Sequence, residues 1–569
     1  MPAPAVVKKE TDAKFVRECR FAFHLIDKEG NDDLHYVKEA VHQTDGSRTP
    51  NVRLLLNYKR PYWIAKKAFR NYEQKRERIS LDHVDRFEST QRNLLRSAAT
   101  SLGTPWFRGS MRDLQNSPYL YGTDITSTAL IRQGYKERWN ILTPYSYATT
   151  DVETDVVRGT DEIIMQVIVM ESRAVLVAQE IVYKGYANPL ERLRACAEKY
   201  LARDMKENGL TVEFMIVPTE IDVVKTIVGL AHEWKPDFLG VHNLLFDMEK
   251  MIAACKRAGV EPEDIFNDPK LPRRFRHFNF KIGPAKKITS SGRVMTYKPS
   301  DRWHTVESPA SFYWVCSMGG YRRAREGQKE ETSYGLDHLL GLTIQRSKMK
   351  FDLAGELDGL AWHQYMQANH PFEYSMYCIF DGFGMILMER KTRDMTVSIP
   401  TFAESSDYSK MSSQPRRTMD ALHLHLLKYE NSVVGTTGSV VETPDDKLVV
   451  SCNGWITALP SENVVDNGLQ LIAENPNMRT NIRTNGADLD VAGAYPTNEV
   501  TGNNSKETTV KEMISIEGTS DYAYRQNSLN LSGGQTNAVQ FCIEMLGYPT
   551  QTQMLEQYLV RRNSILIPR

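Results

Sequence analysis

Three short runs between Tyr145 and Glu180 decide the fold: YSYATTDVET at 145–154, DEIIMQVIVM at 161–170 and SRAVLVAQE at 172–180. Each run is apolar or alternating and rich in Val, Ile or Thr, and turn residues separate them. This pattern predicts three adjacent β-strands. Taken together, the three runs indicate one β-sheet in this part of the chain.

The segments that follow these runs alternate between helical and strand-like patterns. Leu190–Lys206 has helical spacing, TVEFMIVP at 211–218 predicts another strand, and Glu220–Trp234 predicts an amphipathic helix that Pro236 helps to end. This alternation predicts an α/β domain, of mixed α+β class, in which helices pack on a mixed sheet.

Patterns farther from the three runs are weaker. The first ~140 residues mix strand-like runs such as Arg20–Asp27 with basic, helix-leaning segments such as Ala68–Arg78. Farther along the chain, the sequence predicts helical zones at Tyr334–Leu342 and Trp362–Met388, a connector at Ser412–Ser461, a strand at Ala487–Ala494 and a helical run at Asn537–Val560.

Composition narrows the class of protein. With 569 residues the chain is expected to form two to four domains, and 71 basic against 71 acidic residues argue against nucleic-acid binding by bulk charge. The longest apolar stretch, Ile163–Met170, is too short to cross a bilayer, and the first residues, MPAPAVVKKETDAKF, lack the apolar core of a secretory signal. Seven scattered cysteines indicate reduced thiols. We therefore expect a cytoplasmic multidomain protein without a membrane partner.

Four carboxylates and a tyrosine stand out as candidates for chemistry. Asp151 and Glu153 lie two apart at the end of the first strand, so both side chains face the same way. Asp247 closes GVHNLLFD, and Asp381 follows Tyr377 by four residues, which places both on one helix face. Phosphodiester hydrolysis is commonly catalysed by two Mg²⁺ ions ~3.5–4 Å apart, which need clustered oxygen ligands. Taken singly, each of these residues is more often structural.

The order of these motifs resembles a known signature. Asp-x-Glu on a strand, then Phe-Asp, then Tyr-x-x-x-Asp on a helix is similar to the exonuclease superfamily with four acids and a tyrosine, in particular the proofreading domain of phage-type family-B DNA polymerases. Ser333–Leu342 resembles the helix that precedes the third motif.

This resemblance implies a ribonuclease H-like exonuclease domain and assigns roles to its residues. Asp151, Glu153, Asp247 and Asp381 would bind two Mg²⁺, for which Mn²⁺ can substitute. Tyr377 would orient the attacking water, and Phe246 would stack near the 3′-terminal base of DNA.

One position departs from the resembled pattern. His242 stands where this branch usually has an Asn that helps to arrange the DNA, and Asn243 follows it. His-Asn-Leu-x-Phe-Asp is similar to the motif in the protein-primed branch of the family. Either side chain could donate the hydrogen bond to DNA, and an ordinary histidine satisfied within the protein is the alternative for His242.

A basic segment lies inside the same domain. Lys270–Arg302 contains ten Lys or Arg and one acid, with aromatic residues interleaved, and ITSSGRVM at 288–295 predicts two strands around a Gly turn. Basic residues with aromatics suit phosphates and unstacked bases. The resemblance implies a hairpin that helps to separate primer from template, with DNA contacts from Lys286, Lys287 and Arg293. A solvated surface loop is the alternative.

The run DVAGAYPT at 490–497 resembles motif A of a family-B palm. By that match Asp490 binds the catalytic metals, the carbonyl of Val491 adds a ligand, and Tyr495 lies under the incoming nucleotide's sugar. Gly493 and Ala494 depart from the usual Ser-Leu. No Asp-Thr-Asp and no Tyr-Gly follow Asp490, so polymerisation by this chain alone is not expected.

The combined expectation is the N-terminal subunit of a split, phage-type family-B polymerase. Its expected parts are an N-terminal α+β domain at 1–142, the exonuclease at 143–393, a connector returning to the N-terminal domain at 394–440, and an incomplete palm, with a start of the fingers, at 441–569. Expected partners are primer-template DNA, a single-stranded 3′ end, a second chain with the remaining palm, fingers and thumb, and a sliding clamp, in the host-cell cytoplasm. Two alternatives stay open: a stand-alone exonuclease with a vestigial palm, and an inactive DNA-binding scaffold.

Overall fold

The computed structural model describes residues 16–73, 75–139, 143–288, 294–325, 328–398, 414–435, 528–531 and 534–537. Contacts divide the chain into two units, 1–439 and 440–569. In the second unit the described residues form one antiparallel hairpin, β19 (Ser528–Leu531) with β20 (Gly534–Asn537). The strand predicted at Ala487–Ala494 and the motif at 490–497 lie outside the described residues, as does the helical run predicted beyond Asn537.

Among the described residues of the first unit, six strands form one mixed sheet in the order β11-β10-β9-β8-β12-β17. They are β8 (Tyr147–Thr154), β9 (Ile163–Met170), β10 (Arg173–Gln179), β11 (Thr211–Val217), β12 (Phe238–Val241) and β17 (Tyr313–Cys316). β9 is antiparallel to β8 and β10, whereas β11 runs parallel to β10, and β12 runs parallel to β8 and β17. The three strands predicted between Tyr145 and Glu180 are β8, β9 and β10, so that prediction is confirmed, as is the mixed α+β class.

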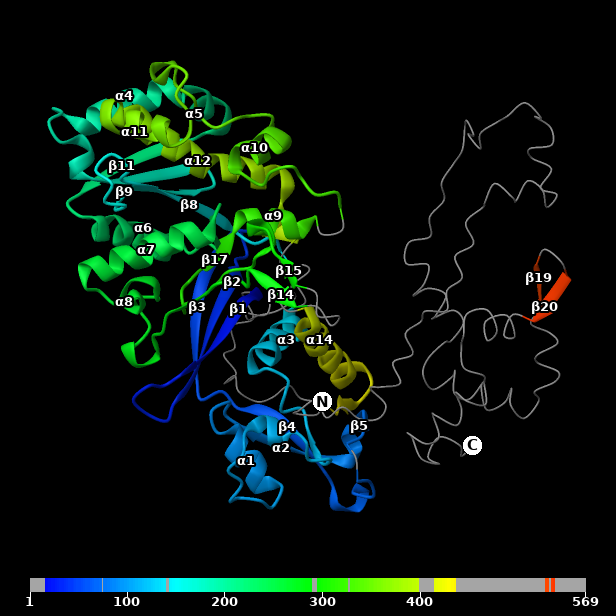
Figure 1. Cartoon of the computed structure of the whole chain (residues 1–569). Helices are drawn as coiled ribbons and strands as arrows, with labels where there is room; N and C mark the ends of the chain where they lie inside the picture. Colours follow the sequence, from blue (N-terminus) through cyan, green and yellow to red (C-terminus); the bar gives the residue numbers. More distant parts are fainter. Residues whose placement is uncertain are drawn as a thin grey trace. The chain divides into compact units, whose positions relative to one another are not determined.

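Helices cover both faces of this sheet, as Figure 1 shows, with α4, α10, α11 and α12 on one face and α6, α7 and α8 on the other. Their bounds are α4 (Pro189–Tyr200), α5 (Ala202–Asn208), α6 (Glu220–Trp234), α7 (Leu244–Ala258), α8 (Pro262–Phe266), α9 (Ser317–Ala324), α10 (Leu336–Ile344), α11 (Gly359–Asn369) and α12 (Pro371–Thr392). Successive residues of β9 pack into opposite apolar layers, with Val167 beneath the α12 side and Ile168 beneath the α6 side. The central strands are therefore buried on both faces.

The helix predicted for Glu220–Trp234 is α6, and its signals act as expected. Thr219 caps its first turn by accepting a hydrogen bond from the backbone N–H of Asp222, and Lys235 ends it in the left-handed conformation just before Pro236. Two other helical zones are each divided. Leu190–Lys206 breaks at Leu201 into α4 and α5, and Trp362–Met388 breaks at His370, because Pro371 starts a new helix.

The helix-leaning prediction for Ala68–Arg78 is wrong. Among the described residues of this segment, the structure has a short 3-10 turn, Lys67–Phe69, and then the start of β5 (Arg78–Ser80). The segment offers few apolar side chains for a helical stripe, so helix formation would bury little surface. Instead Lys75 donates to the carbonyl of Gln115, and the guanidinium of Arg76 stacks on Tyr72.

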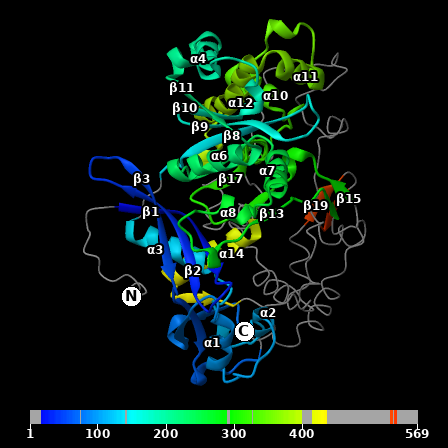
Figure 2. The ribbon, with the colours of Figure 1, turned by 90° about the vertical axis from the view of Figure 1, so that its left-hand side faces the viewer.

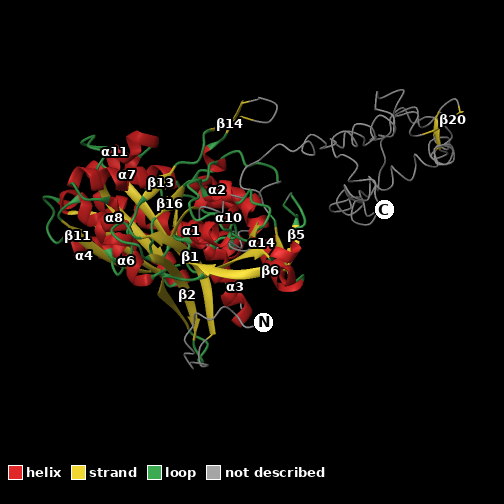
Figure 3. Cartoon of the chain, turned by 90° about the horizontal axis from the view of Figure 1, so that it is seen from below, coloured by secondary structure: helices red, strands yellow, loops and turns green. Residues whose placement is uncertain are grey.

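The first part of the chain builds two antiparallel sheets, ordered β1-β2-β3 and β6-β4-β7. Figure 3 draws the strands in yellow and labels β1, β2 and β6 among them. The strands of these sheets are β1 (Val16–Ile26), β2 (Asp33–His42), β3 (Arg48–Leu56), β4 (Arg60–Ala65), β6 (Val84–Ser89) and β7 (Leu120–Tyr121). The same part of the chain contains the helices α1 (Leu94–Ser101), α2 (Met111–Leu114) and α3 (Ser127–Trp139). The buried Lys38 of β2 donates to the carbonyls of Lys235 (2.8 Å) and Ser311 (2.6 Å), which ties this part to the six-stranded sheet's domain.

The segment at 414–435 returns to the first part of the chain. α14 (Gln414–Tyr429) contacts α3, and Figure 2 labels both helices. β18 (Ser432–Val434) pairs with β5. The predicted hairpin is confirmed as β14 (Lys286–Ile288) paired with β15 (Val294–Thr296), while β13 (Asn279–Lys281) pairs with β16 (Thr305–Glu307). Across the described residues, none of the helices has the length and apolar character needed to span a membrane.

Candidate metal centre

Asp151 and Glu153 lie on β8, near the middle of the six-stranded sheet, and they project to the same side because they are two residues apart. Asp151 is half-buried and Glu153 is buried. The hydroxyl of Tyr374, on α12, donates to the carboxylate of Glu153. Tyr374 is itself held by the Gln367 amide (3.2 Å) and the His363 ring (2.8 Å), so Glu153 is fixed by a chain of hydrogen bonds.

Asp247 reaches the same region from the neighbouring strand. It lies in the first turn of α7, a few residues after β12, which is the parallel neighbour of β8. Parallel strands end at the same edge of a sheet, so the side chains after β12 meet those at the end of β8. Burial and then the charges of Asp151 and Glu153 raise the pKa of Asp247 well above its ordinary value. The three acids therefore act on one another electrostatically.

α12 supplies the third set of side chains. Tyr377 and Asp381 are one turn apart on its buried face, and Cys378 lies beside them. The helix lies close to the sheet because Gly382 has no side chain: a Cβ there would lie 2.8 Å from a methyl carbon of Val167. The Thr149 hydroxyl of β8 also donates to the Gly382 carbonyl (2.7 Å). Close packing of α12 thus brings its polar residues to β8.

Sequence reasoning missed Lys348, which enters this centre from the loop after α10. Its ammonium group donates to Asp381 (2.5 Å) and to the hydroxyl of Tyr377 (2.8 Å). The loop is fixed because the backbone N–H of Lys348 donates to Asp337 (2.6 Å) and Arg346 makes two hydrogen bonds to Asp204. Nothing in the sequence distinguishes Lys348 from its basic neighbours Arg346 and Lys350, so only the fold reveals it.

The electrostatics of the centre favour added positive charge. Burial, and then the charge of Asp381, raises the pKa of Asp151 to about 7. Burial also raises the pKa of Glu153 and Asp381, and the ammonium of Lys348 is the counter-charge that lowers the pKa of each carboxyl group. In turn, burial lowers the pKa of Lys348, but the carboxylates of Asp381 and Asp151 raise it above its ordinary value overall.

The residues present fit a divalent cation. One carboxylate oxygen each from Asp151 and Glu153, with the sulfur of Cys378, lie within 4.8 Å of one another. Asp381 is buried, and its Oδ1 has no hydrogen-bond partner within the described structure. A buried acceptor without a donor is costly, and a bound cation would satisfy it. These are groups that could hold a metal ion.

The residues predicted to contact DNA differ in availability. Phe246, on α7 one residue before Asp247, is 42% exposed, and the ammonium of Lys250 lies 4.9 Å from its ring centre. The ring nitrogen Nε2 of His242 bonds the carbonyl of Tyr334 (3.0 Å), which makes it the donor and leaves Nδ1 without a proton. Asn243 is exposed. Asn243 is therefore the more accessible of the two side chains, and the hydrogen bond to DNA stays a prediction.

Five of the ten basic residues of this segment form ion pairs with acids in the described structure, mostly at the surface. Ion pairs join Arg273 and Arg276 to Asp264, Arg274 to Asp27 and Asp32, Lys281 to Glu307, and Lys298 to Glu330. Lys286 is exposed on β14, whereas the side chain of Lys287 and all of Arg293 lie outside the described residues. A DNA contact from this hairpin stays a prediction, as do the roles of Asp490, Val491 and Tyr495.

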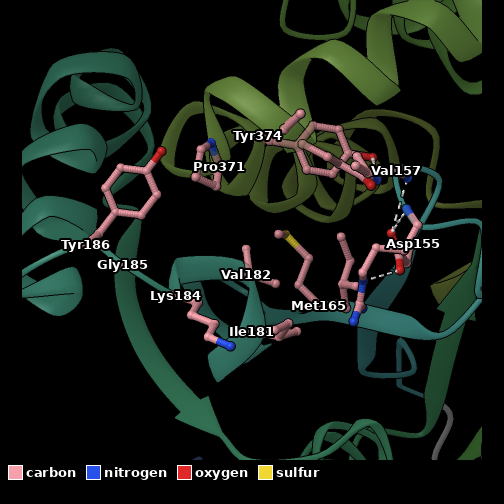
Figure 4. Close-up of a pocket in the computed structure, with 14 residues that line it drawn as sticks. Asp155, Val157, Met165, Ile181, Val182, Lys184, Gly185, Tyr186, Pro371 and Tyr374 are labelled. Carbon is pink, nitrogen blue, oxygen red and sulfur yellow. Dashed lines mark hydrogen bonds and ion pairs between the residues drawn. The ribbon is translucent and has the colours of Figure 1, made fainter.

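A cavity of about 430 Å³ borders the centre. Figure 4 shows Tyr374 and Asp155 near one end of this cavity and Tyr186 and Lys184 near the other, with Ile181, Val182 and Met165 between them. Tyr374 therefore forms a wall shared by the cavity and, through its hydroxyl, the carboxylate cluster.

In comparisons with known proteins, the chain matches no family model and no curated protein.

Proposed function

We propose that this chain is a metal-dependent 3′→5′ DNA exonuclease of the family-B polymerase type, with a ribonuclease H-like exonuclease domain. One observation carries the proposal: residues from three separate motifs meet at one buried centre. Asp151 and Glu153 come from β8, Asp247 from α7, and Tyr377 and Asp381 from α12.

The four carboxylates would hold two Mg²⁺, with Mn²⁺ as a substitute, and these ions would supply positive charge to the scissile phosphate and a more acidic water. The chain's own residues do the rest. Tyr377 offers a hydroxyl that orients a water, and Lys348 fixes that hydroxyl by donating to it. Phe246 presents an exposed ring on which an unpaired terminal base can stack.

We further propose that the exonuclease belongs to a split polymerase. Support comes from the sequence Asp490-Val-Ala-Gly-Ala-Tyr-Pro, in which Asp490 and Tyr495 match a palm motif. A partner chain would supply the second palm aspartate motif and the Tyr-Gly pair, and primer-template DNA would be the shared substrate. The proposed partners and the host-cell location rest on this motif alone.

The test is digestion of 3′-labelled single-stranded DNA with Mg²⁺ or Mn²⁺ by the full chain. Asp151→Ala combined with Glu153→Ala should abolish digestion, because removing metal ligands costs several kcal/mol of transition-state stabilisation. Glu249→Ala is the matched control, since Glu249 is an exposed acid on the same helix as Asp247. Undiminished digestion by the double variant would reject the assignment.

The scaffold alternative predicts a different result from the same experiment. A protein that only holds DNA would bind the single strand without shortening it, with or without metal. The centre argues against this alternative because a scaffold has no use for four acids sharing one lysine, an arrangement that raises the cost of burial.

A further inference from the structure

The centre contains a thiol, which a site built only for Mg²⁺ does not need. Cys378 is completely buried, and its sulfur lies within 4.8 Å of a carboxylate oxygen of Asp151 and of Glu153, which are themselves within that distance of each other. These groups come from α12 and β8, so the tertiary packing of the helix on the sheet brings them together.

The surroundings of this thiol are not those of an ordinary core cysteine. A buried cysteine usually behaves as a small apolar side chain among apolar neighbours. Cys378 does pack in the apolar layer under α12, but all four acids of the centre also act on it electrostatically. Burial, followed by the charges of Glu153 and Asp151, raises the pKa of its thiol.

A second observation points to a cation at the same place. Asp381, one turn after Cys378 on α12, is 1% exposed, and its Oδ1 accepts no hydrogen bond from the described residues. Its charge acts on both Asp151 and Cys378. This buried carboxylate oxygen has no hydrogen-bond donor among the described residues, and two further carboxylates and a thiol lie beside it. A bound cation would satisfy this group of ligands.

Ligand chemistry indicates which ion this set prefers. Mg²⁺ takes oxygen ligands and gains nothing from sulfur, whereas Zn²⁺ and Cd²⁺ bind thiolate together with carboxylate. We propose that Asp151, Glu153 and Cys378 form a binding site for a soft divalent cation of the Zn²⁺ class. On binding, the S–H bond of Cys378 breaks, a metal–sulfur bond forms, and the proton leaves to solvent, with no change of oxidation state.

Such an ion would occupy two of the carboxylates that the nuclease reaction requires. The regulatory part of the inference therefore rests on the proposed function: Zn²⁺ competes with Mg²⁺ at Asp151 and Glu153 and switches digestion off. The binding part does not rest on it, because the three ligands and their spacing are properties of the folded chain alone.

The test uses the full-length, metal-free chain titrated with Cd²⁺, whose bond to a thiolate gives an ultraviolet charge-transfer absorption. We expect saturable absorption that is lost in Cys378→Ser and kept in Cys196→Ser, a half-buried cysteine on α4 remote from these acids in sequence and outside the metal-ligating group. Equal absorption in wild type and Cys378→Ser, or none in either, would overturn the proposal.

Asp151→Asn is the second variant, which keeps the test decisive if Cys378→Ser does not fold. It should shift the Cd²⁺ titration to at least ten-fold higher concentration, and an unshifted titration would count against the site. Zn²⁺ inhibition is expressed relative to each protein's own digestion rate with Mg²⁺ alone. Half-inhibition of Cys378→Ser should then need at least ten-fold more Zn²⁺ than half-inhibition of the wild type. Digestion without a Cd²⁺–thiolate band would defeat this inference alone, whereas a band without digestion by the wild type would defeat the proposed function alone.

Discussion

Lys348 supplies a positive charge beside the four acids of the centre in the metal-free protein. Among the described residues, its ammonium group lowers the pKa of Asp151, Glu153, Asp247 and Asp381 alike. It is held at both ends, by Asp337 at its backbone and by Asp381 and Tyr377 at its side chain. Removing it therefore leaves the carboxylates without a counter-charge unless a metal is present.

We expect Lys348→Met to destabilise the metal-free protein by on the order of 2 kcal/mol, less than the ~3–5 kcal/mol typical when one partner of a fully buried pair is removed. The reduction reflects the 29% exposure of the Lys348 side chain. Chemical unfolding in a chelator measures the effect, and excess Mg²⁺ should shrink it because bound cations replace the lost charge. Lys350→Met, at an exposed position two residues later, should change stability little. Equal stability of the two variants would show that Lys348 is not the counter-charge.

Tyr377 tests the orienting role of a single hydroxyl. Tyr377→Phe keeps the ring, which packs 4.9 Å from Trp362 and 5.7 Å from Tyr374 between ring centres, so the fold should persist. We expect turnover on single-stranded DNA to fall ~10²-fold, as for positioned groups in other hydrolytic sites. Unchanged turnover, with an unchanged unfolding midpoint as control, would return Tyr377 to a packing role.

At the scale of elements, the position of α12 on the sheet decides whether the centre exists. A Cβ on Gly382 would lie 2.8 Å from Val167 and 3.1 Å from Val169, both of which point from β9 into the same layer. The carbonyl of Gly382 also accepts the Thr149 hydroxyl. A substitution here must push the helix away from β8 and β9, and Cys378 and Asp381 move with it.

We expect Gly382→Ala to lower the free energy of unfolding by on the order of 1 kcal/mol, since overpacking costs ~1–3 kcal/mol and Ala gains ~1 kcal/mol of helix propensity. Digestion should fall as well. Gly229→Ala in α6 is the matched control, because nothing lies within 4 Å of its added Cβ, and it should stabilise the protein. Urea unfolding and digestion rates of both variants measure the difference; a fully active Gly382→Ala would mean that the helix position tolerates movement.

The sequence predicts the elements of this region well where hydrophobic periodicity is strong. β8, β9, β10 and α6 follow directly from their patterns. The division of Trp362–Met388 at Pro371 needed only a local signal, the proline itself. The failure at Ala68–Arg78 has another cause, since side-chain contacts with distant residues such as Gln115 override local propensity.

The candidate site is less visible in the sequence than its elements. Its acids could be selected because each closes a recognisable motif. Lys348, Tyr374 and Cys378 could not, since their relevance depends on which side of α12 faces β8 and on where the loop after α10 folds back. The pairing of five of the ten basic residues between Lys270 and Arg302 with acids elsewhere is likewise a tertiary property.

At the scale of the whole molecule, the described residues of the candidate metal centre all belong to the unit 1–439, whereas Asp490 belongs to the unit 440–569. Two sites that share no ligands are expected to respond independently to substitution, with deviations of only ~0.3–0.5 kcal/mol. Single substitutions can therefore test the proposed polymerase site and the proposed nuclease site separately.

The prediction is that Asp490→Asn leaves 3′→5′ digestion within ~2-fold of the wild type, because ~0.5 kcal/mol corresponds to about that factor. DNA synthesis should appear only when the wild-type chain is mixed with a second polypeptide that carries an Asp-Thr-Asp turn and a Lys…Tyr-Gly helix. Asp490→Asn should eliminate this synthesis, because Asp490 would hold both metals of the palm. Asp488→Asn, two residues earlier and outside the motif, is the control and should support synthesis. Primer extension by the isolated chain would contradict the division of the palm, and loss of digestion in Asp490→Asn would contradict the independence of the two sites.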